Sequence, residues 1–292
     1  MKLVTFENKN NISIGAVKND HVIDFSHSSL PVEMIEFIKL GEEGLNRAND
    51  IIENPENELP ISNLKLLAPI SKPNKILAVG LNYKEHRDEV AKTASKTIGK
   101  AQEKYPNIFN KQNTSVNGPY DSIHRPRASE FLDYEGELGF VIGKKAINVS
   151  VEKALDHVLG FFLVNDVSER NFQKNKGLTW DKGKGFDTFG PIGPYIITKD
   201  ELPDFQKLDM FLDVDGKRMQ TGNTEKMIFD IKTLVSYMSS CMSLHPGDIC
   251  CTGTPPGVGE NMSPPKYLKG GEEVVLSIDK LGTQKHKVHP YK

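Results

Sequence analysis

The apolar residues of this chain fall mostly into short runs that predict β-strands. Seven of these runs lie beyond residue 64, and each is bounded by Gly, Pro, Asn or Asp. They occupy residues 75–79, 137–142, 158–164, 195–198, 209–214, 249–251 and 273–278. The last run is followed by a turn-like segment and a further run at 283–288, which is typical of a β-hairpin. The body of the chain is therefore predicted to be rich in strands.

Helical periodicity is restricted to fewer segments. Short helices are predicted at 83–92 and 151–155, and a longer one at 230–242. One face of the longer segment is apolar at helical spacing and comprises Ile231, Leu234, Val235 and Met238. The sequence lacks regular strand–helix alternation and a G-x-G-x-x-G turn, which argues against a dinucleotide-binding fold. The predicted fold class is a β-rich α+β protein.

The N-terminal residues predict a small separate module. Runs at 2–7, 12–18 and 21–24 are joined by turn-rich segments and predict a three-stranded meander. Two helix faces follow, and the segment NPENEL at 54–59 has the composition of a linker. We therefore predict an N-terminal module at residues 1–62, followed by a catalytic domain at residues 63–292.

Composition and charge indicate which binding partners and which cellular location to expect. The 292 residues include 37 Lys and Arg against 39 Asp and Glu, so the charge gives no reason to expect nucleic acid or an anionic membrane as a partner. The longest apolar run, 158–164, is far shorter than the ~20 residues of a membrane-spanning helix. The first ten residues lack the apolar stretch of a secretory signal. Three cysteines, Cys241, Cys250 and Cys251, are too few for a disulfide framework or a zinc site, so a reduced, cytoplasmic protein is expected.

Three acidic residues form the first candidate site. Residues 132–142 read LDYEGELGFVI, and the period of a strand places Glu135 and Glu137 on one face, beside an apolar face. Such a pair is either open to water or neutralised by a cation, and by itself favours an exposed acidic face. Asp166 follows the apolar run at 158–164, where its carboxylate could face a cleft or cap the next segment. Three carboxylates together would suit Mg²⁺ or Mn²⁺ better than Zn²⁺.

Longer motifs carry a family resemblance. The segments DYEGELGFVIG, GFFLVNDVSERNFQ and HPGDICCTGTPPGVG together resemble the fumarylacetoacetate hydrolase family. The segments KILAVGLNYKEH, KGFDTFGPIGP, QTGNTEKMIFD and PPKYLKGGE are similar to family segments in the same order. The resemblance covers about residues 64–290. It implies a mixed β-roll fold, a homodimer, and Mg²⁺ or Mn²⁺ held by Glu135, Glu137 and Asp166.

The same resemblance implies catalytic roles for three further residues. His86 and Glu89 are three positions apart, which on a helix places them on one face. Spacing alone favours a surface ion pair, whereas the resemblance implies a dyad that activates water. Lys184 lies in the glycine-rich segment LTWDKGKGFDTFGP, where the resemblance implies that it stabilises enolate charge. Lys182 is its rival for that role.

Four residues are candidates for substrate binding. The resemblance places Arg170 and Gln173 in the lining of the site, and Thr254 in a loop that binds a substrate carboxylate. A plain Gly/Pro turn is the alternative explanation for that loop. Lys111 keeps a family position, although Gln112 replaces the Pro that many members carry after this Lys. The polar, Lys-rich stretch 91–104 is predicted to be either a solvated surface loop or a lid.

The resemblance implies chemistry on a small 2-oxo acid. The first hypothesis is a metal-dependent hydrolase that cleaves a C–C bond in acylpyruvate- or fumarylacetoacetate-type acids and releases a stabilised pyruvate enolate. The second is an oxaloacetate decarboxylase, or a 2-hydroxyhepta-2,4-diene-1,7-dioate (hydroxymuconate-type) isomerase or decarboxylase, on the same scaffold. The third is a binding protein without turnover, which the presence of the whole residue set argues against.

Overall fold

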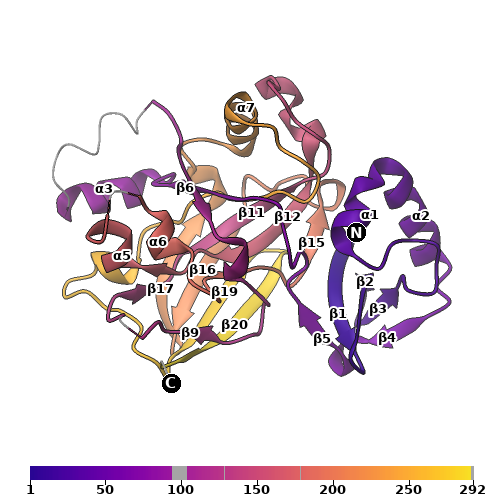
Figure 1. The fold of residues 1–292 in the computed structure, drawn as a ribbon, viewed down its shortest axis with the longest axis horizontal. Helices are drawn as coiled ribbons and strands as arrows, with labels where there is room; N and C mark the ends of the chain where they lie inside the picture. Colours follow the sequence, from indigo (N-terminus) through magenta and orange to yellow (C-terminus); the bar gives the residue numbers. More distant parts are fainter. Residues whose placement is uncertain (94–103, 128, 178, 291–292) are drawn as a thin grey trace.

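The computed structural model of this chain describes residues 1–93, 104–127, 129–177 and 179–290 (Figure 1). Strands make up most of its regular structure. In chain order they are β1 (Lys2–Asn8), β2 (Asn11–Lys18), β3 (His21–Asp24), β4 (Glu58–Pro60), β5 (Lys65–Leu67), β6 (Ile76–Gly80), β7 (Asn107–Lys111), β8 (Val116–Asn117), β9 (Ile123–His124), β10 (Leu132–Asp133), β11 (Gly136–Ile142), β12 (Val158–Asn165), β13 (Ser168–Glu169), β14 (Gly190–Pro191), β15 (Ile196–Thr198), β16 (Asp209–Val214), β17 (Lys217–Asn223), β18 (Ile249–Cys251), β19 (Glu273–Ile278) and β20 (Gly282–His289).

The helices of the described residues are fewer than the strands and lie around the sheets. The α-helices are α1 (Met34–Lys39), α2 (Gly41–Glu53), α3 (Lys84–Thr93), α5 (Arg170–Lys174), α6 (Asp181–Lys184) and α7 (Ile231–Cys241). The 3₁₀ turns are η1 (Ile61–Asn63), η2 (Asn113–Ser115), η3 (Val151–His157), η4 (Lys199–Glu201), η5 (Thr224–Lys226) and η6 (Gly259–Asn261). α7 begins after Asp230, whose carboxylate accepts the Thr233 N–H, and it buries the predicted apolar face. No described helix is long and apolar enough to cross a membrane.

Two sheets form the body of the molecule. The larger follows the order β4-β3-β2-β1-β15-β12-β11-β18-β6-β7, with β5 added beside β1, and the smaller follows β17-β16-β19-β20-β9. Most neighbours are antiparallel, but β18 is parallel to β6 and β20 is parallel to β9. The predicted β-rich α+β class is therefore confirmed, with both parallel and antiparallel pairs.

The central strands β11 and β12 are buried on both faces. On one face Leu138 and Phe140 belong to an apolar core shared with Leu212 and Leu276 of the smaller sheet. On the other face Val141 packs in a second core that includes Phe37 of α1. A strand covered on both sides has little freedom to shift its register, because any slip would move polar groups into a core. These two strands therefore form a rigid base for the site described below.

The N-terminal strands extend the larger sheet rather than forming a separate one. β1 pairs with β15 through Lys2↔Ile197 and Leu3↔Ile196, and it also pairs with β5, which follows residue 62. Figure 1 shows β1 to β5, α1 and α2 grouped on one side of the molecule, away from α3, α5 and α6. The domain boundary between residues 62 and 63 stays a prediction.

A buried histidine in the smaller sheet gives a prediction about acid stability. Burial lowers the pKa of His286 to about 4, although its Nδ1 lies 2.8 Å from the Asp121 carbonyl oxygen, a contact that opposes the shift. Between pH 6.5 and 4 the unfolded chain therefore binds the extra proton, and stability falls as the pH falls. We expect up to about 3 kcal/mol to be lost across this window.

Urea unfolding at a series of pH values measures this effect. His286→Gln should flatten the dependence of the unfolding free energy on pH between 6.5 and 4. His27→Gln is the matched control, because His27 is exposed and should leave the slope unchanged. An unchanged slope in His286→Gln would contradict the assignment.

Candidate active site

The pairing of β11 with β12 brings the three predicted acidic residues together. Gly136 at the start of β11 lies opposite Asn165 at the end of β12. Glu135 and Glu137 flank the first of these positions and Asp166 follows the second, so all three side chains reach one point. Each offers a carboxylate oxygen, and these oxygens lie within 4.8 Å of one another. All three residues are buried, so the alternative of an exposed acidic face is wrong.

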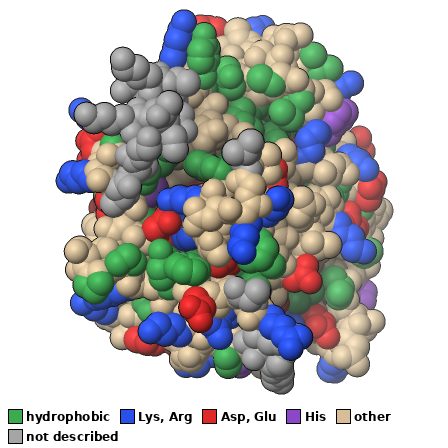
Figure 2. Space-filling model, turned by 60° about the vertical axis from the view of Figure 1, so that its left-hand side comes forward, with side chains coloured by type: hydrophobic (Ala, Val, Ile, Leu, Met, Phe, Trp, Pro, Cys, Tyr) green, Lys and Arg blue, Asp and Glu red, His purple; other side chains and the backbone are tan. Residues whose placement is uncertain are grey.

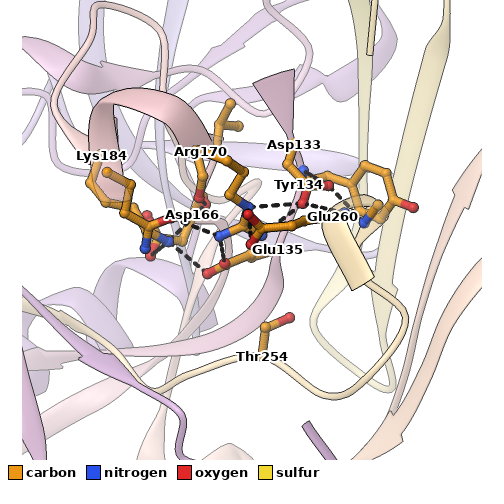
Figure 3. A network of polar contacts seen from close by, with 12 residues as sticks. Asp133, Tyr134, Glu135, Asp166, Arg170, Lys184, Thr254 and Glu260 are labelled. Carbon is orange, nitrogen blue, oxygen red and sulfur yellow. Dashed lines mark hydrogen bonds and ion pairs between the residues drawn. The ribbon is translucent and has the colours of Figure 1, made fainter. Parts of the chain in front are cut away.

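Two lysines neutralise part of this acidic cluster. Lys184 at the end of α6 places its Nζ 2.7 Å from Glu135 Oε2 and 2.7 Å from Asp166 Oδ2 (Figure 3). Lys111 of β7 places its Nζ 2.6 Å from Asp166 Oδ1. Lys182, the rival of Lys184, instead donates to the Lys176 carbonyl oxygen at an exposed position. Of the two rivals Lys182 and Lys184, Lys184 is thus the one that reaches the acids.

Arg170 joins the cluster to a neighbouring loop. Its Nη1 lies 2.6 Å from Glu135 Oε1 and 3.1 Å from Gln173 Oε1, while its Nη2 lies 2.8 Å from Asp133 Oδ2. Asp133 also accepts the backbone N–H groups of Gly259 and Glu260. Figure 3 shows Arg170 between Glu135 and this second carboxylate. The buried guanidinium therefore fixes the loop that follows Gly257 against the acidic cluster.

The three acids differ in their electrostatic environment. Burial opposes ionisation of Glu135, but the charges of Lys184 and Arg170 outweigh it and hold its pKa well below the usual range. Burial, Asp166 and Glu135 together raise the pKa of Glu137 well above its usual range. Glu137 forms no salt bridge with any residue in the described part of the chain.

A divalent cation fits this imbalance. The donors are hard carboxylate oxygens, which suit Mg²⁺ or Mn²⁺, and no Cys or His belongs to the cluster of described residues. The Gly253 N–H, 2.8 Å from Glu137 Oε2, orients one of the three carboxylates. Gly253 has φ +99°, a conformation that favours glycine, and it lies against Asn82. This buried cluster could thus hold a divalent cation.

The predicted histidine–glutamate pair is formed at the first turns of α3. Asn82 anchors the start of this helix by donating to the carbonyl oxygens of Thr252 and Phe229. The His86 Nδ1 lies 3.2 Å from Glu89 Oε2, which confirms the predicted proximity. Glu89 also accepts from Asn261 Nδ2 at 3.2 Å. Burial opposes the ionisation of Glu89, yet the contacts with His86 and Asn261 lower its pKa overall.

One cavity of about 290 Å³ connects these groups. It is lined by seven of the predicted residues, namely His86, Glu135, Glu137, Arg170, Gln173, Lys184 and Thr254. The Thr254 hydroxyl donates to the Gly136 carbonyl oxygen and accepts from Gln220, and Figure 3 shows Thr254 on a separate loop from the ion pairs. Figure 2 shows acidic and basic side chains interspersed over one outer face of the molecule.

Three predicted features need separate comment. Lys111 does not line the cavity: its Nζ contacts Asp166 and the carbonyl oxygens of Val167 and Lys184, so its substrate-binding role stays a prediction. Glu89 contacts His86 but does not line the cavity. The stretch 91–104, predicted as a surface loop or lid, falls largely outside the described residues.

Comparison with known proteins identifies the family. Residues 75–289 match the family described as fumarylacetoacetate (FAA) hydrolase, C-terminal. The chain belongs to the fumarylacetoacetate hydrolase family. A protein of Burkholderia cenocepacia that is provisionally described as a hydrolase is 49% identical over 218 residues, which cover 74% of each chain.

Solved structures share the whole fold. Fumarylacetoacetate hydrolase from Exiguobacterium antarcticum has a TM-score of 0.86 and 33% identity over 99% of each chain. Maleylpyruvate hydrolase from Sphingobium sp. SYK-6, in complex with manganese(II) and pyruvate, has a TM-score of 0.82 and 28% identity over 100% of each chain. 2-Hydroxyhepta-2,4-diene-1,7-dioate isomerase from Mycobacterium marinum has a TM-score of 0.77 and 29% identity over 99% of this chain and 98% of that one. These relatives place the protein in a superfamily of hydrolases and isomerases.

Proposed function

We propose that this fumarylacetoacetate hydrolase family member is a divalent-metal-dependent hydrolase of acylpyruvate- or fumarylacetoacetate-type 2-oxo acids. The observation that carries the proposal is that Glu135 and Glu137, two acids of the cluster they form with Asp166, line the same cavity as His86. Pyruvate and manganese in the Sphingobium relative support it, because pyruvate is the enolate half of such a substrate.

The acidic cluster is the proposed metal site. Glu135, Glu137 and Asp166 would hold Mg²⁺ or Mn²⁺ through carboxylate oxygens. When bound, the ion supplies Lewis-acid stabilisation to the oxygens of a 2-oxo acid. Lys111 contacts Asp166 Oδ1 and Lys184 contacts Asp166 Oδ2, and the two contacts together fix the direction in which this carboxylate points.

His86 is the proposed general base. A carboxylate can only accept a hydrogen bond, so Glu89 favours the tautomer with a proton on His86 Nδ1. His86 Nε2 is then the nitrogen that takes a proton from water. The water oxygen forms a bond to the distal carbonyl carbon of the substrate. The neighbouring C–C bond breaks, its electron pair passes into the pyruvate enolate, and a proton then completes pyruvate.

The cationic residues around the cavity would stabilise the negative charge of the substrate and of the enolate. Lys184 is buried, and although burial opposes its protonation, Asp166 and Glu135 raise its pKa. It therefore stays an ammonium and stabilises the charge that develops on the enolate. Arg170 and Gln173 line the cavity, as does Thr254, whose hydroxyl donates to the Gly136 carbonyl oxygen. We propose these three as substrate-binding residues, in a homodimeric, cytoplasmic enzyme.

A panel of substrates tests the reaction class. We expect Mn²⁺- or Mg²⁺-dependent release of pyruvate and a carboxylic acid from acylpyruvates, measured by coupled lactate dehydrogenase and by NMR of both products. Release of CO₂ from oxaloacetate without acylpyruvate cleavage would instead support the decarboxylase. Movement of a double bond without cleavage would support an isomerase, as in the Mycobacterium marinum relative. Metal binding without turnover of any compound would support a binding protein.

A further inference from the structure

Part of the cavity lining is apolar and is called the apolar wall, while Glu135, Glu137, Arg170 and Lys184 form its charged part, called the ionic floor. The apolar wall is formed by Val79, Leu81, Val90, Phe109, Trp180 and Val258. These side chains come from five separate parts of the chain: β6 and the residue after it, α3, β7, the residue before α6, and the loop after Gly257. Val90 lies one helical turn beyond His86, so this wall continues directly from the proposed base.

Trp180 is held in place within this wall. Its ring meets Phe109 edge to face, with 5.3 Å between centroids and 60° between planes. On its other side it lies over Gly80, where an added Cβ would be only 2.2 Å from Trp180 Cζ3. Gly80 therefore permits the indole to occupy this position, since any larger side chain would displace it. The aromatic wall is a built feature of the cavity and not a loose surface contact.

The cations that line the cavity already have carboxylate partners in the described part of the chain. Lys184 contacts Glu135 and Asp166, while Arg170 contacts Asp133 and Glu135. Lys174 lies at the rim, where its Nζ is 2.5 Å from Glu260 Oε2. A second carboxylate on the substrate would lose its hydration against apolar side chains without gaining a new cationic partner.

We propose that the acyl group of the substrate ends in an uncharged, apolar alkyl or aryl group that packs against Phe109 and Trp180. This inference rests on the proposed hydrolase function and narrows its substrate class. Trp180 then determines specificity, because together with Phe109, whose ring centroid lies 5.2 Å from Lys184 Nζ, it supplies the aromatic surface of the cavity. Acids with a second, distal carboxylate are disfavoured, although the ionic floor still accepts their 2-oxo acid half.

Two matched compounds test the inference. Butanoylpyruvate and succinylpyruvate have acyl chains of the same length, ending in a methyl group and a carboxylate respectively. We expect kcat/KM to favour butanoylpyruvate by at least about tenfold in the Mn²⁺-loaded enzyme. Equal values, or a preference for succinylpyruvate, would overturn the inference while leaving the hydrolase function intact. If neither compound is cleaved, the hydrolase function fails. The affinities of the enzyme for the same two acids are then measured by calorimetry, and an affinity for butanoylpyruvate at least about tenfold higher than for succinylpyruvate supports the inference.

Variants of residues that line the cavity test which side chains cause the preference for butanoylpyruvate. Trp180→Ala should reduce the ratio at least about fivefold, whereas Trp180→Phe should keep most of it. Val90→Lys introduces a cation beside the wall and should shift the ratio toward succinylpyruvate, and it provides an independent test if Trp180→Ala does not fold. Lys174→Met is the control for the rim: a selective loss of succinylpyruvate cleavage would show that Lys174 receives a distal carboxylate, which would contradict the proposal.

Discussion

Replacing His86 with Ala is expected to lower kcat/KM for acylpyruvate hydrolysis by about 10²–10⁴. The imidazole contacts Glu89 through Nδ1 and lines the cavity, so its removal eliminates the group that accepts the proton of the attacking water. The acidic cluster does not depend on this side chain for an ion pair. Binding of Mn²⁺, measured by calorimetry, should therefore stay close to that of the wild type.

Variants of two other residues on the same helix separate catalysis from folding. Glu89→Gln keeps the volume of the side chain but removes its charge, and should lower kcat with little effect on Mn²⁺ affinity. Glu85→Gln is the matched control, because Glu85 is exposed and pairs with Lys226 outside the cavity. It should retain full activity. Undiminished hydrolysis by His86→Ala or Glu89→Gln would remove the proposed dyad.

Local sequence pattern predicts the central part of the fold and much of the site. The apolar runs at 137–142 and 158–164 become β11 and β12, because continuous burial leaves few alternatives for such segments. Once these strands pair, the acids at their ends must meet. The helical spacing of His86 and Glu89 is likewise a local property, and the observed contact follows from it.

Contacts between distant segments and polar edge strands are not evident from the sequence. β17, at the edge of the smaller sheet, reads KRMQTGN and carries too little apolar pattern to predict a strand. Lys111 and Asp166 are far apart in sequence, so only the tertiary fold shows that Lys111 lies beside this carboxylate. The same holds for Asn261, which contacts Glu89, and for Asp133, which contacts Arg170. Whether such contacts form depends on which loops come together in the tertiary fold, and the local periodicity of the sequence does not predict this.

Replacing Glu137 and replacing Glu135, two glutamates of the acidic cluster, should have opposite effects on the stability of the fold. Burial, Asp166 and Glu135 raise the pKa of Glu137, so its ionisation costs stability as the pH rises above the unfolded value of about 4.5. Without added metal, Glu137→Gln should therefore be as stable as the wild type or more stable at neutral pH. Glu135→Gln should lose about 3 kcal/mol, because Lys184 and Arg170 would each lose a buried partner.

Adding metal should reverse the advantage of Glu137→Gln. At about 100 times its Kd, Mn²⁺ stabilises a protein that binds it only when folded by about 2.7 kcal/mol, which corresponds to a rise in Tm of about 5 °C for the wild type. Glu137→Gln removes one of the three ligand oxygens and should show little of this rise. Differential scanning calorimetry with and without Mn²⁺ measures both effects without reference to turnover. Glu137 is the acid of the cluster that lacks a salt bridge within the described chain, so its carboxylate is expected to bind the ion. An equal rise in Tm for Glu137→Gln and the wild type would therefore show that the ion binds elsewhere.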